Sequence, residues 1–222
     1  MSDWVNDRTL RDHAPTAAGT WRVVVPVKGG PGAKSRLRAP DGVDRVVLAR
    51  ALALDTVTAA VEAVGPDHVV VVTSDRDVVA AVRGFGARTL PDPDQGLNGA
   101  VRAGLAAVPS GHPAAVLLGD VPALRAADLR TALATADGYE GWFVPDAEGT
   151  GTVLLGAREA TSLRPRFGSG SAARHEADGH VRLDLALERL RRDVDDAASL
   201  GEALRLGVGP STAALLAHLI GL

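Results

Sequence analysis

The sequence contains no cysteine, which excludes disulfide bonds, thiolate-ligated zinc and a thiol nucleophile. Aromatic residues make up 3% of its 222 residues, so there is little material for stacking on nucleic-acid bases. The formal net charge is −3, whereas general binders of nucleic acid or membrane surfaces need a basic face. We therefore expect a small-molecule partner, with no nucleic acid and no membrane.

Long apolar runs are also absent, since none approaches the roughly 18 residues of a membrane-spanning helix. The first 20 residues mix charges of both signs and lack the apolar segment of a signal peptide. The length suits one α/β domain with a single core. We expect a flexible N-terminal tail over residues 1–20, one domain over 21–222, and a soluble, cytoplasmic protein.

Lysine is scarce, with two residues against 22 arginines, and both lysines lie in "VVVPVKGGPGAKSRL". The arginine excess itself is explained by a GC-rich genome. A lysine kept in such a sequence indicates a position where a compact ammonium does what a planar guanidinium cannot. Lys28 and Lys34 flank Gly29 and Gly30, whose main-chain N–H groups can approach an anion. A phosphate-binding loop is predicted, with a plain turn as the alternative, because the spacing matches neither a Walker loop nor GxGxxG.

Short valine-rich runs alternate along the chain with segments of helical periodicity. A short continuous apolar run is typical of a buried parallel strand, and apolar residues every three to four positions indicate a helix with one buried side. Strands are predicted at 21–27, 68–73 and 115–119, and helices at 46–64, 97–108 and 124–136. This alternation predicts βαβ units and a largely parallel sheet.

The rhythm changes after residue 126. Two short strands are predicted at 141–144 and 152–155, around the turn "PDAEGTG". The pattern of "HVRLDLALERL" fits a strand and a helix equally, and both alternatives stay open. The segment that begins at Pro210 predicts a helix, because proline and serine suit a helix N-terminus.

Ligands of open parallel sheets bind at the carboxyl ends of the strands, which here are followed by the lysine loop, "TSDRD" and "GDVPAL". Asp120 ends an apolar strand and is predicted to ligate Mg²⁺, with a helix cap as the alternative. A second acidic cluster, "RRDVDD", contains Asp193, Asp195 and Asp196. If it returns to Asp120 in space, two metal ions could act on one phosphoryl transfer. Asp196 also suits the N-cap of the next helix.

Two segments combine glycine with hydroxyl residues, "EGTGTV" and "RPRFGSGSAARH". The second precedes a predicted short helix whose first N–H groups could bind an anion, although a plain turn is as good an explanation of each segment alone. Arg166 and Arg174 could form bidentate contacts to a carboxylate or phosphate. His175 could be an acid–base residue, but a surface histidine on a short helix is preferred. Hydrolase chemistry has no support, because no nucleophile elbow is present.

Six segments, in their order along the chain, resemble a known family: "VPVKGGPGAKSRL", "LPDPDQGLNGAV", "LLGDVPAL", "EGTGTVLL", "PRFGSGSAARH" and "RRDVDD". The chain resembles the 2-phospholactate and phosphoenolpyruvate guanylyltransferases of coenzyme F-420 biosynthesis from about residue 21 to 210. "PRFGSGSAARH" and the spaced lysines are specific to this family, whereas the wider superfamily shares "GDVPAL". The resemblance implies an α/β, single-domain, Rossmann-like and glycosyltransferase-A-like three-layer sandwich with a mostly parallel sheet. It also implies Mg²⁺-dependent transfer of GMP from GTP to the phosphate of a three-carbon acid, with release of pyrophosphate.

The resemblance implies residue roles as well. Catalysis falls to Lys28, Lys34 and Asp120. Nucleotide binding falls to Gly29, Gly30, Lys34, Asn98 and Asp120, and phospho-acid binding to Thr152, Gly168 and Ser171. The Mg²⁺ ligands would be Asp120 and Asp193, with Asp195 sharing or replacing the role of Asp193.

The first loop departs from the superfamily pattern of GxGxR followed by PK, so its contact with the triphosphate is the least specific part of the assignment. Alternatives are another Mg²⁺-dependent nucleotidyltransferase, of the molybdopterin or sugar-phosphate type, and a non-catalytic nucleotide-binding regulator. The acceptor stays open between phosphoenolpyruvate and 2-phospholactate. Resemblance to arginine-rich relatives favours phosphoenolpyruvate.

Overall fold

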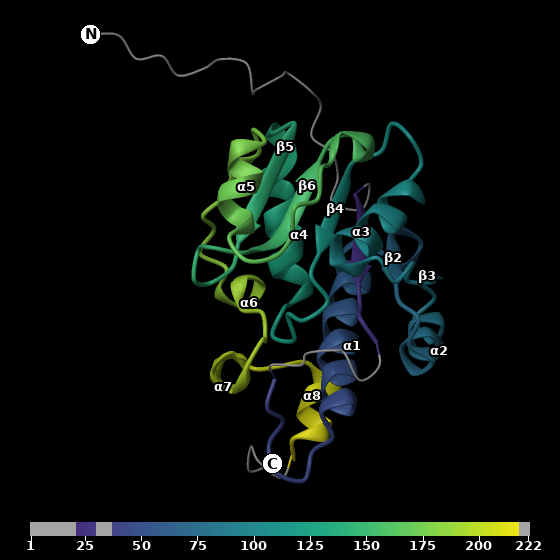
Figure 1. Cartoon of the computed structure of the whole chain (residues 1–222), viewed down its shortest axis with the longest axis vertical. Helices are drawn as coiled ribbons and strands as arrows, with labels where there is room; N and C mark the ends of the chain where they lie inside the picture. Colours follow the sequence, from purple (N-terminus) through teal and green to yellow (C-terminus); the bar gives the residue numbers. More distant parts are fainter. Residues whose placement is uncertain (1–20, 30–36, 218–222) are drawn as a thin grey trace, which may run out of the picture.

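A computed structural model describes residues 21–29 and 37–217, so the expected tail, Gly30 and Lys34 lie outside the described residues. Within this part of the chain one sheet has the strand order β3-β2-β1-β4-β6-β5-β7, with helices on both faces (Figure 1). The strands are β1 (Arg22–Pro26), β2 (Val69–Val72), β3 (Arg88–Leu90), β4 (Ala114–Leu117), β5 (Gly141–Pro145), β6 (Thr152–Ala157) and β7 (Val181–Arg182). The predicted α/β fold is confirmed.

The sheet is mostly parallel, as predicted, because β1 pairs in parallel with both β2 and β4, and β2 with β3. The exception is β6, which runs antiparallel to β4 and to β5 because a short turn joins it to β5 as a hairpin. The ambiguous segment after residue 180 contains both elements: β7 pairs with β5, and a helix follows it. Strand β3 was not predicted, because this three-residue edge strand has no buried apolar run.

Eight α-helices are described: α1 (Arg45–Val64), α2 (Arg76–Gly84), α3 (Gly96–Ala106), α4 (Ala126–Thr135), α5 (Ser171–Ala177), α6 (Glu188–Arg191), α7 (Ala197–Leu206) and α8 (Pro210–Leu215). Helix α1 begins where the carboxylate of Asp44 accepts the N–H groups of Val46 and Val47 at 2.7 and 3.0 Å. None of the described helices is long and apolar enough to cross a membrane.

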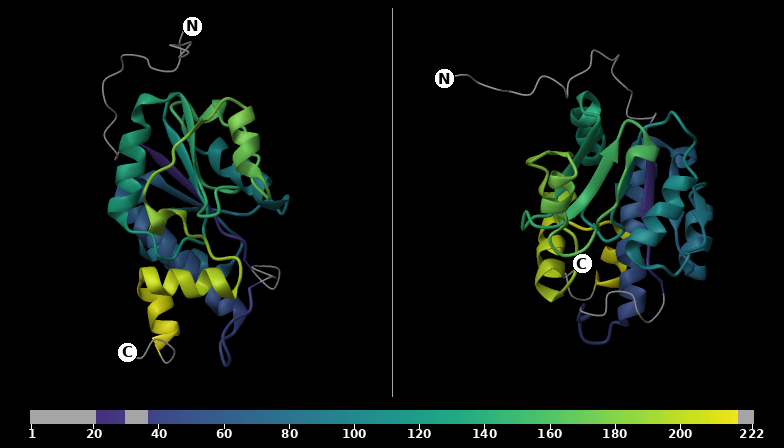
Figure 2. Two further views of the ribbon diagram at one scale, coloured as in Figure 1. Left: turned by 90° about the vertical axis from the view of Figure 1, so that its left-hand side faces the viewer. Right: turned by 45° about the horizontal axis from the view of Figure 1, so that its top comes forward.

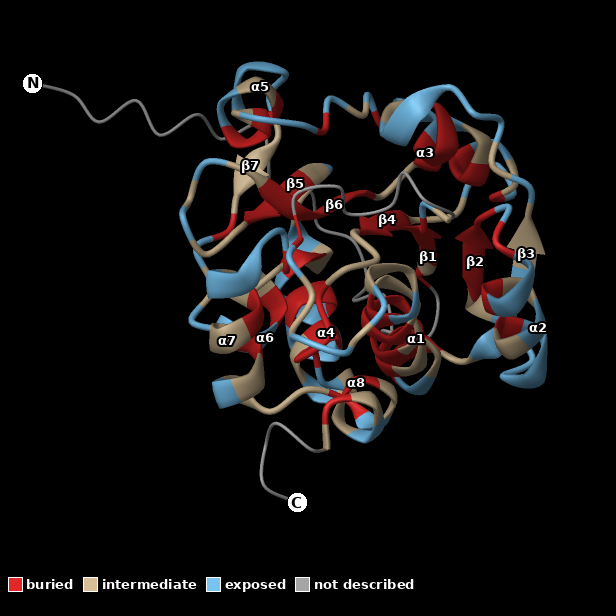
Figure 3. Cartoon of the chain, turned by 60° about the horizontal axis from the view of Figure 1, so that its bottom comes forward, coloured by how far each residue is buried: buried red, intermediate tan, exposed pale blue. Residues whose placement is uncertain are grey.

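Alternate residues of β1 face two separate cores, which makes the molecule three layers thick. Val23 and Val25 pack with residues of α1, α2 and α4, whereas Val24 packs with Val101 of α3 and Ala172 of α5. Figure 2 (left) shows the sheet nearly edge-on between α4, in teal, and α5, in light green. Figure 3 shows the buried faces of α1 and α4 turned toward the sheet.

A third cluster lies on the outer side of α1 and joins it to the C-terminal helices. Its members are Leu37, Leu48, Leu52, Val194, Leu200, Ala203 and Leu216. Val194 is fully buried here. Burial of a side chain of this size stabilises the folded state by roughly 1.5–3 kcal/mol. This burial fixes the position of the acidic segment on either side of it.

Candidate active site

Three acidic side chains from two distant segments meet beyond the carboxyl end of β4. Asp120 follows β4, and Asp193 and Asp195 lie between α6 and α7. The N–H of Val194 donates to the carbonyl oxygen of Asp120 at 3.0 Å, which ties the two segments together. One carboxylate oxygen from each of the three aspartates lies within 4.8 Å of the others. The structure thus brings together the three predicted metal ligands.

Glycine at position 119 allows this approach, since a Cβ there would lie 2.7 Å from the carbonyl oxygen of Pro26 and 2.9 Å from Val27. Asp120 therefore sits against the end of β1. Its alternative role as a cap of α4 is not observed, because the N-cap residue of α4 is Arg125. Asp196 is the N-cap of α7 and accepts the N–H of Ser199 at 2.9 Å.

The donor set of the cluster suits a hard divalent cation. All three groups offer carboxylate oxygens, which Mg²⁺ and Mn²⁺ prefer, and no nitrogen or sulfur ligand belongs to the cluster as described. Asp120 and Asp193 are half-buried and Asp195 is exposed, so the cluster is accessible from solvent.

A cavity of about 710 Å³ lies over the carboxyl ends of the strands, within the range of small-molecule sites. The three aspartates and Lys28 line one side of it, and Thr152 with the loop 167–171 lines the other. Lys28 is exposed and lies two residues beyond the end of β1. Gly29 packs closely on Asp75, since a Cβ at Gly29 would lie 2.5 Å from the Asp75 Cβ.

The loop 166–170 is shaped by Arg174, which donates to the carbonyl oxygens of Arg166, Gly168 and Ser169 at 2.7–3.2 Å. Because a peptide plane holds its N–H opposite its carbonyl, the N–H groups of Ser169 and Gly170 point away from this guanidinium. Both residues line the cavity. Anion binding by these main-chain N–H groups stays a prediction for this segment.

The predicted contacts of the two arginines with a ligand are corrected by this arrangement. Arg174 is engaged with main-chain carbonyls of its own loop, and Arg166 forms an ion pair with Asp178 at 2.8 Å. Asn98 is likewise engaged: its side chain donates to the carbonyl of Phe167 at 3.1 Å and accepts the Phe167 N–H at 2.9 Å. It supports the loop and is not among the residues that line the cavity.

The hairpin turn between β5 and β6 forms the neighbouring wall. The carboxylate of Asp146 accepts the N–H groups of Thr150 and Gly151 at 2.9 and 2.7 Å. A Cβ at Gly151 would lie 2.2 Å from that carboxylate, so the turn requires glycine there. Asp146 also lines the cavity and was not predicted from the sequence, although aspartate before a glycine-rich turn is a usable signal.

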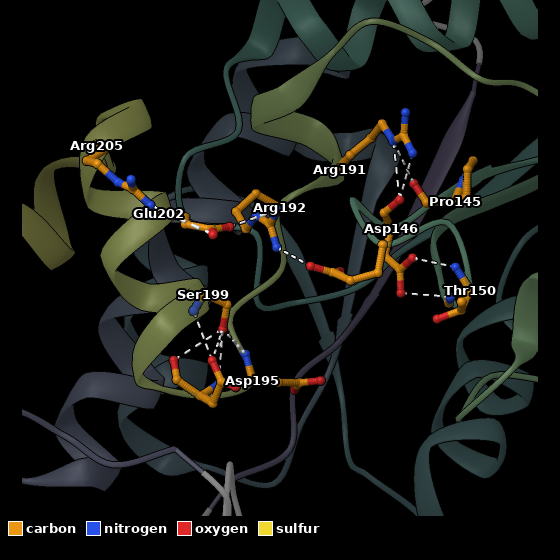
Figure 4. A network of polar contacts seen from close by, with 12 residues as sticks. Pro145, Asp146, Thr150, Arg191, Arg192, Asp195, Ser199, Glu202 and Arg205 are labelled. Atoms are coloured by element: carbon orange, nitrogen blue, oxygen red, sulfur yellow. Dashed lines mark hydrogen bonds and ion pairs between the residues drawn. The ribbon is translucent and has the colours of Figure 1, made fainter.

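Arginine side chains join this hairpin to the acidic segment (Figure 4). Arg191 donates to the carbonyls of Pro145 and Asp146 at 2.9–3.2 Å. Arg192 pairs with Glu148 at 2.5 Å and with Glu202 at 2.8 Å. Partly exposed pairs of this kind contribute about 1 kcal/mol or less each, so their main effect is to orient the two walls of the cavity.

Asp75, in the "TSDRD" loop, is a second residue whose position the sequence did not give. It is buried, accepts the N–H groups of Asp77 and Val78 at the start of α2, and pairs with Arg50 at 2.9 Å. Although burial opposes ionisation, the hydrogen bond from Arg50 lowers the pKa of Asp75. This charged pair supports the first loop through its contact with Gly29.

His175 was expected at the surface, and this prediction is wrong, because the side chain is 0% exposed. Its ring packs against Phe167 and Phe143, with ring centroids 5.3 and 5.9 Å apart. The short helix α5 turns one face to the sheet, and Ala172, three residues earlier, is on that face. That spacing was the available signal. Nδ1 lies 2.9 Å from Thr152 Oγ1, and the N–H of Arg166 donates to Nε2 at 3.1 Å.

We expect His175 to make the protein less stable in acid. Burial, followed by the charge of His180, lowers the pKa of His175 from 6.5 to about 4. Between these values the unfolded chain binds a proton that the folded chain does not, so stability is lost as the pH falls from 6.5 toward 4, by about 3 kcal/mol. Urea unfolding at pH 7 and 4.5 measures it. His175→Phe should lose part of this pH dependence, and His112→Gln should keep it. An equal change in the free energy of unfolding between the two pH values in the wild type and both variants would contradict the assignment to His175.

Comparison with known proteins finds nucleotidyltransferases, both by family and by individual relatives. The family described as the MobA-like NTP transferase domain matches residues 45–193. A phosphoenolpyruvate guanylyltransferase of Geodermatophilus obscurus is 50% identical over 209 residues, which cover 90% of this chain and 95% of that protein. One from Thermomonospora curvata is 45% identical over 205 residues, covering 90% of each.

Solved structures share the fold. A nucleotidyl transferase from Methanothermobacter superposes with a TM-score of 0.56 at 22% identity, covering 84% of this chain and 98% of that one. A Mycobacterium tuberculosis protein in complex with manganese gives a TM-score of 0.52 at 20% identity, with the same coverage.

Proposed function

The chain belongs to the phosphoenolpyruvate guanylyltransferase family of MobA-like NTP transferases, and on that premise we propose that it transfers GMP from GTP to phosphoenolpyruvate. The family resemblance predicted from the sequence is confirmed, and the protein is a nucleotidyltransferase. The names of the relatives support phosphoenolpyruvate over 2-phospholactate as the acceptor. The proposed pathway is coenzyme F-420 biosynthesis.

The observation that carries the proposal is the cavity with two unlike walls. One wall holds Lys28 and three carboxylates, and the other holds the loop 168–170, whose main-chain N–H groups are the proposed donors to an anion. A donor triphosphate and an acceptor phospho-acid are both anions, and each wall suits a different one of them.

The proposed reaction needs no covalent intermediate. A phosphate oxygen of the acceptor attacks the α-phosphorus of GTP, a new P–O bond forms, and the bond to the β-phosphate oxygen breaks to release pyrophosphate. The attacking oxygen is already ionised, so no protein base is required. The barrier comes from repulsion between two anions, which positioning and positive charge lower.

Asp120 and Asp193 are proposed to hold Mg²⁺, with Asp195 as a third ligand or as a replacement for Asp193. When bound there, the ion supplies charge neutralisation at the phosphates. A manganese complex of a protein with the same fold supports a divalent metal in general. Lys28 would neutralise a phosphate oxygen with an ammonium able to follow it during transfer. Gly29 would offer its N–H, and the roles of Gly30 and Lys34 stay predictions.

On the acceptor side, Thr152, Gly168 and Ser171 are proposed to bind the phospho-acid. All three line the cavity opposite the aspartates. Ser171 opens α5, and its N–H donates to the carbonyl of Gly168 at 3.0 Å, which leaves its hydroxyl as the group proposed to contact the ligand. Gly168 has a φ of 119°, a conformation that favours glycine.

The test is to mix the purified protein with GTP, Mg²⁺ and phosphoenolpyruvate and to measure pyrophosphate. Release that depends on the acceptor supports the proposal. Faster turnover with 2-phospholactate would transfer the assignment to that acceptor. GTP binding without release in the presence of either acceptor would contradict the enzyme proposal and favour a nucleotide-binding regulator.

A further inference from the structure

Thr152 is the first residue of β6 and carries a hydroxyl group beside the cavity. Thr152 is 3% exposed and lines the cavity. Its Oγ1 lies 2.9 Å from Nδ1 of the fully buried His175. Within the described residues this is the one side-chain hydrogen bond of Thr152, so the direction of that bond decides what the hydroxyl offers to a ligand.

The other ring nitrogen of His175 sets this direction. The main-chain N–H of Arg166 points at Nε2 from 3.1 Å, and a peptide N–H can act only as a donor. Nε2 must therefore be the unprotonated acceptor, and a neutral imidazole then carries its proton on Nδ1. Burial, which lowers the pKa of His175 to about 4, keeps the ring neutral. The Nδ1–H consequently donates to Thr152 Oγ1.

A hydroxyl oxygen that accepts this bond still has its own proton to donate. Since no group of the described residues accepts that proton, it is available to a ligand oxygen in the cavity. The same ring holds the loop 166–170 through Arg166, so one side chain fixes the hydroxyl of β6 and the main-chain donors of the loop relative to each other.

We propose that His175 is a positioning residue that commits Thr152 Oγ1–H to donate to an anionic oxygen of the acceptor, a small organic phospho-acid. This inference rests on the proposed function for the identity of the acceptor. The oxygen belongs to a carboxylate or a phosphate, which have the same acceptor chemistry here. His175 itself does not touch the substrate.

The kinetic test uses His175→Phe, which keeps an aromatic ring but removes both polar contacts, and Thr152→Val, which removes the hydroxyl at nearly constant shape. Each should raise the KM for phosphoenolpyruvate by about 10-fold, the effect of one lost hydrogen bond, and leave the KM for GTP unchanged. Thr152→Ser should restore most of the affinity. The increase in the double variant should be clearly smaller than the product of the two single increases, because the contact of His175 with Thr152 is lost in both single variants. His112→Gln, a histidine outside the cavity, is the matched control.

Additive effects in the double variant, or equal increases of both KM values, would overturn the proposal and leave His175 a purely structural residue.

Nitrogen NMR of His175 in the wild-type protein provides an independent readout. We expect the proton on Nδ1 at pH 7; a proton on Nε2, or a charged ring, would contradict the inference even in a protein with full activity. If the wild-type protein released no pyrophosphate, the proposed function would fail, whereas the NMR result and calorimetric binding of phosphoenolpyruvate to wild type and Thr152→Val would still decide the inference.

Discussion

Replacing Asp120 with asparagine is expected to lower the rate of guanylyl transfer by about three orders of magnitude, or about 4 kcal/mol in the activation barrier. The substitution keeps the size of the side chain but removes the charge that suits it to a divalent cation. Asp120 is one of three carboxylates within 4.8 Å of one another, and Asp193 and Asp195 cannot form the same ligand set alone. Pyrophosphate release with GTP, Mg²⁺ and phosphoenolpyruvate measures the effect.

The fold should survive this change, because the bond that ties the two acidic segments uses the main chain of Asp120, which accepts from Val194. Thermal unfolding should therefore stay close to that of the wild type, while calorimetry should show weakened Mn²⁺ binding. Asp67→Asn is the matched control, since Asp67 is exposed and precedes β2 at the opposite end of the sheet. Near-normal turnover and unchanged metal affinity in Asp120→Asn would remove Asp120 from the metal site.

Sequence patterns predicted the parallel half of the sheet well, because its strands are buried on both faces. In β2 all four residues are valine and all are buried, which leaves a continuous apolar run with no ambiguity. The edge strands β3 and β7 lack this signal. Strand β7 contains two half-buried residues, and its position depends on pairing with β5, which a local pattern cannot reveal.

The acidic half of the site was also predictable, for a topological reason. Asp120 follows a buried strand at the edge of the sheet where ligands bind, and the second acidic segment follows the family pattern. What the sequence alone could not give is the means by which the segments meet. The bond from Val194 to Asp120 and the burial of Val194 against α1 and α7 are long-range contacts without a local signature.

The supporting residues were the least predictable part of the site. Asn98, Arg174 and His175 all carry groups that suit ligand contacts, and each is instead engaged with the protein. A polar side chain beside a glycine-rich loop has two possible partners, a ligand or the loop itself. The irregular backbone of such a loop leaves main-chain carbonyl and N–H groups without partners in the loop itself. A nearby polar side chain bonds to these groups because a buried main-chain group without a hydrogen bond is costly.

Lys28 gives the second large effect that we expect. Lys28→Met should lower kcat/KM by about 100-fold or more, comparable to the loss of one charged or hydrogen-bonding group that stabilises a transition state. Lys28 lies two residues beyond the end of β1 and lines the cavity on the side of the aspartates. Lys28→Arg keeps the positive charge but replaces a compact, rotatable ammonium with a larger planar group, so most of the loss should remain. Steady-state kinetics with GTP and phosphoenolpyruvate varied in turn would show which substrate the charge serves.

Arg83→Met is the control for a general effect of net charge, because Arg83 is an exposed cation on α2 that does not line the cavity. It should leave kcat/KM within about twofold of the wild type, as expected for a surface charge away from the site. Equal rates for Lys28→Arg and the wild type would show that position 28 requires only a positive charge. In that case the retention of lysine in an otherwise arginine-rich chain would need an explanation other than the geometry of the ammonium group.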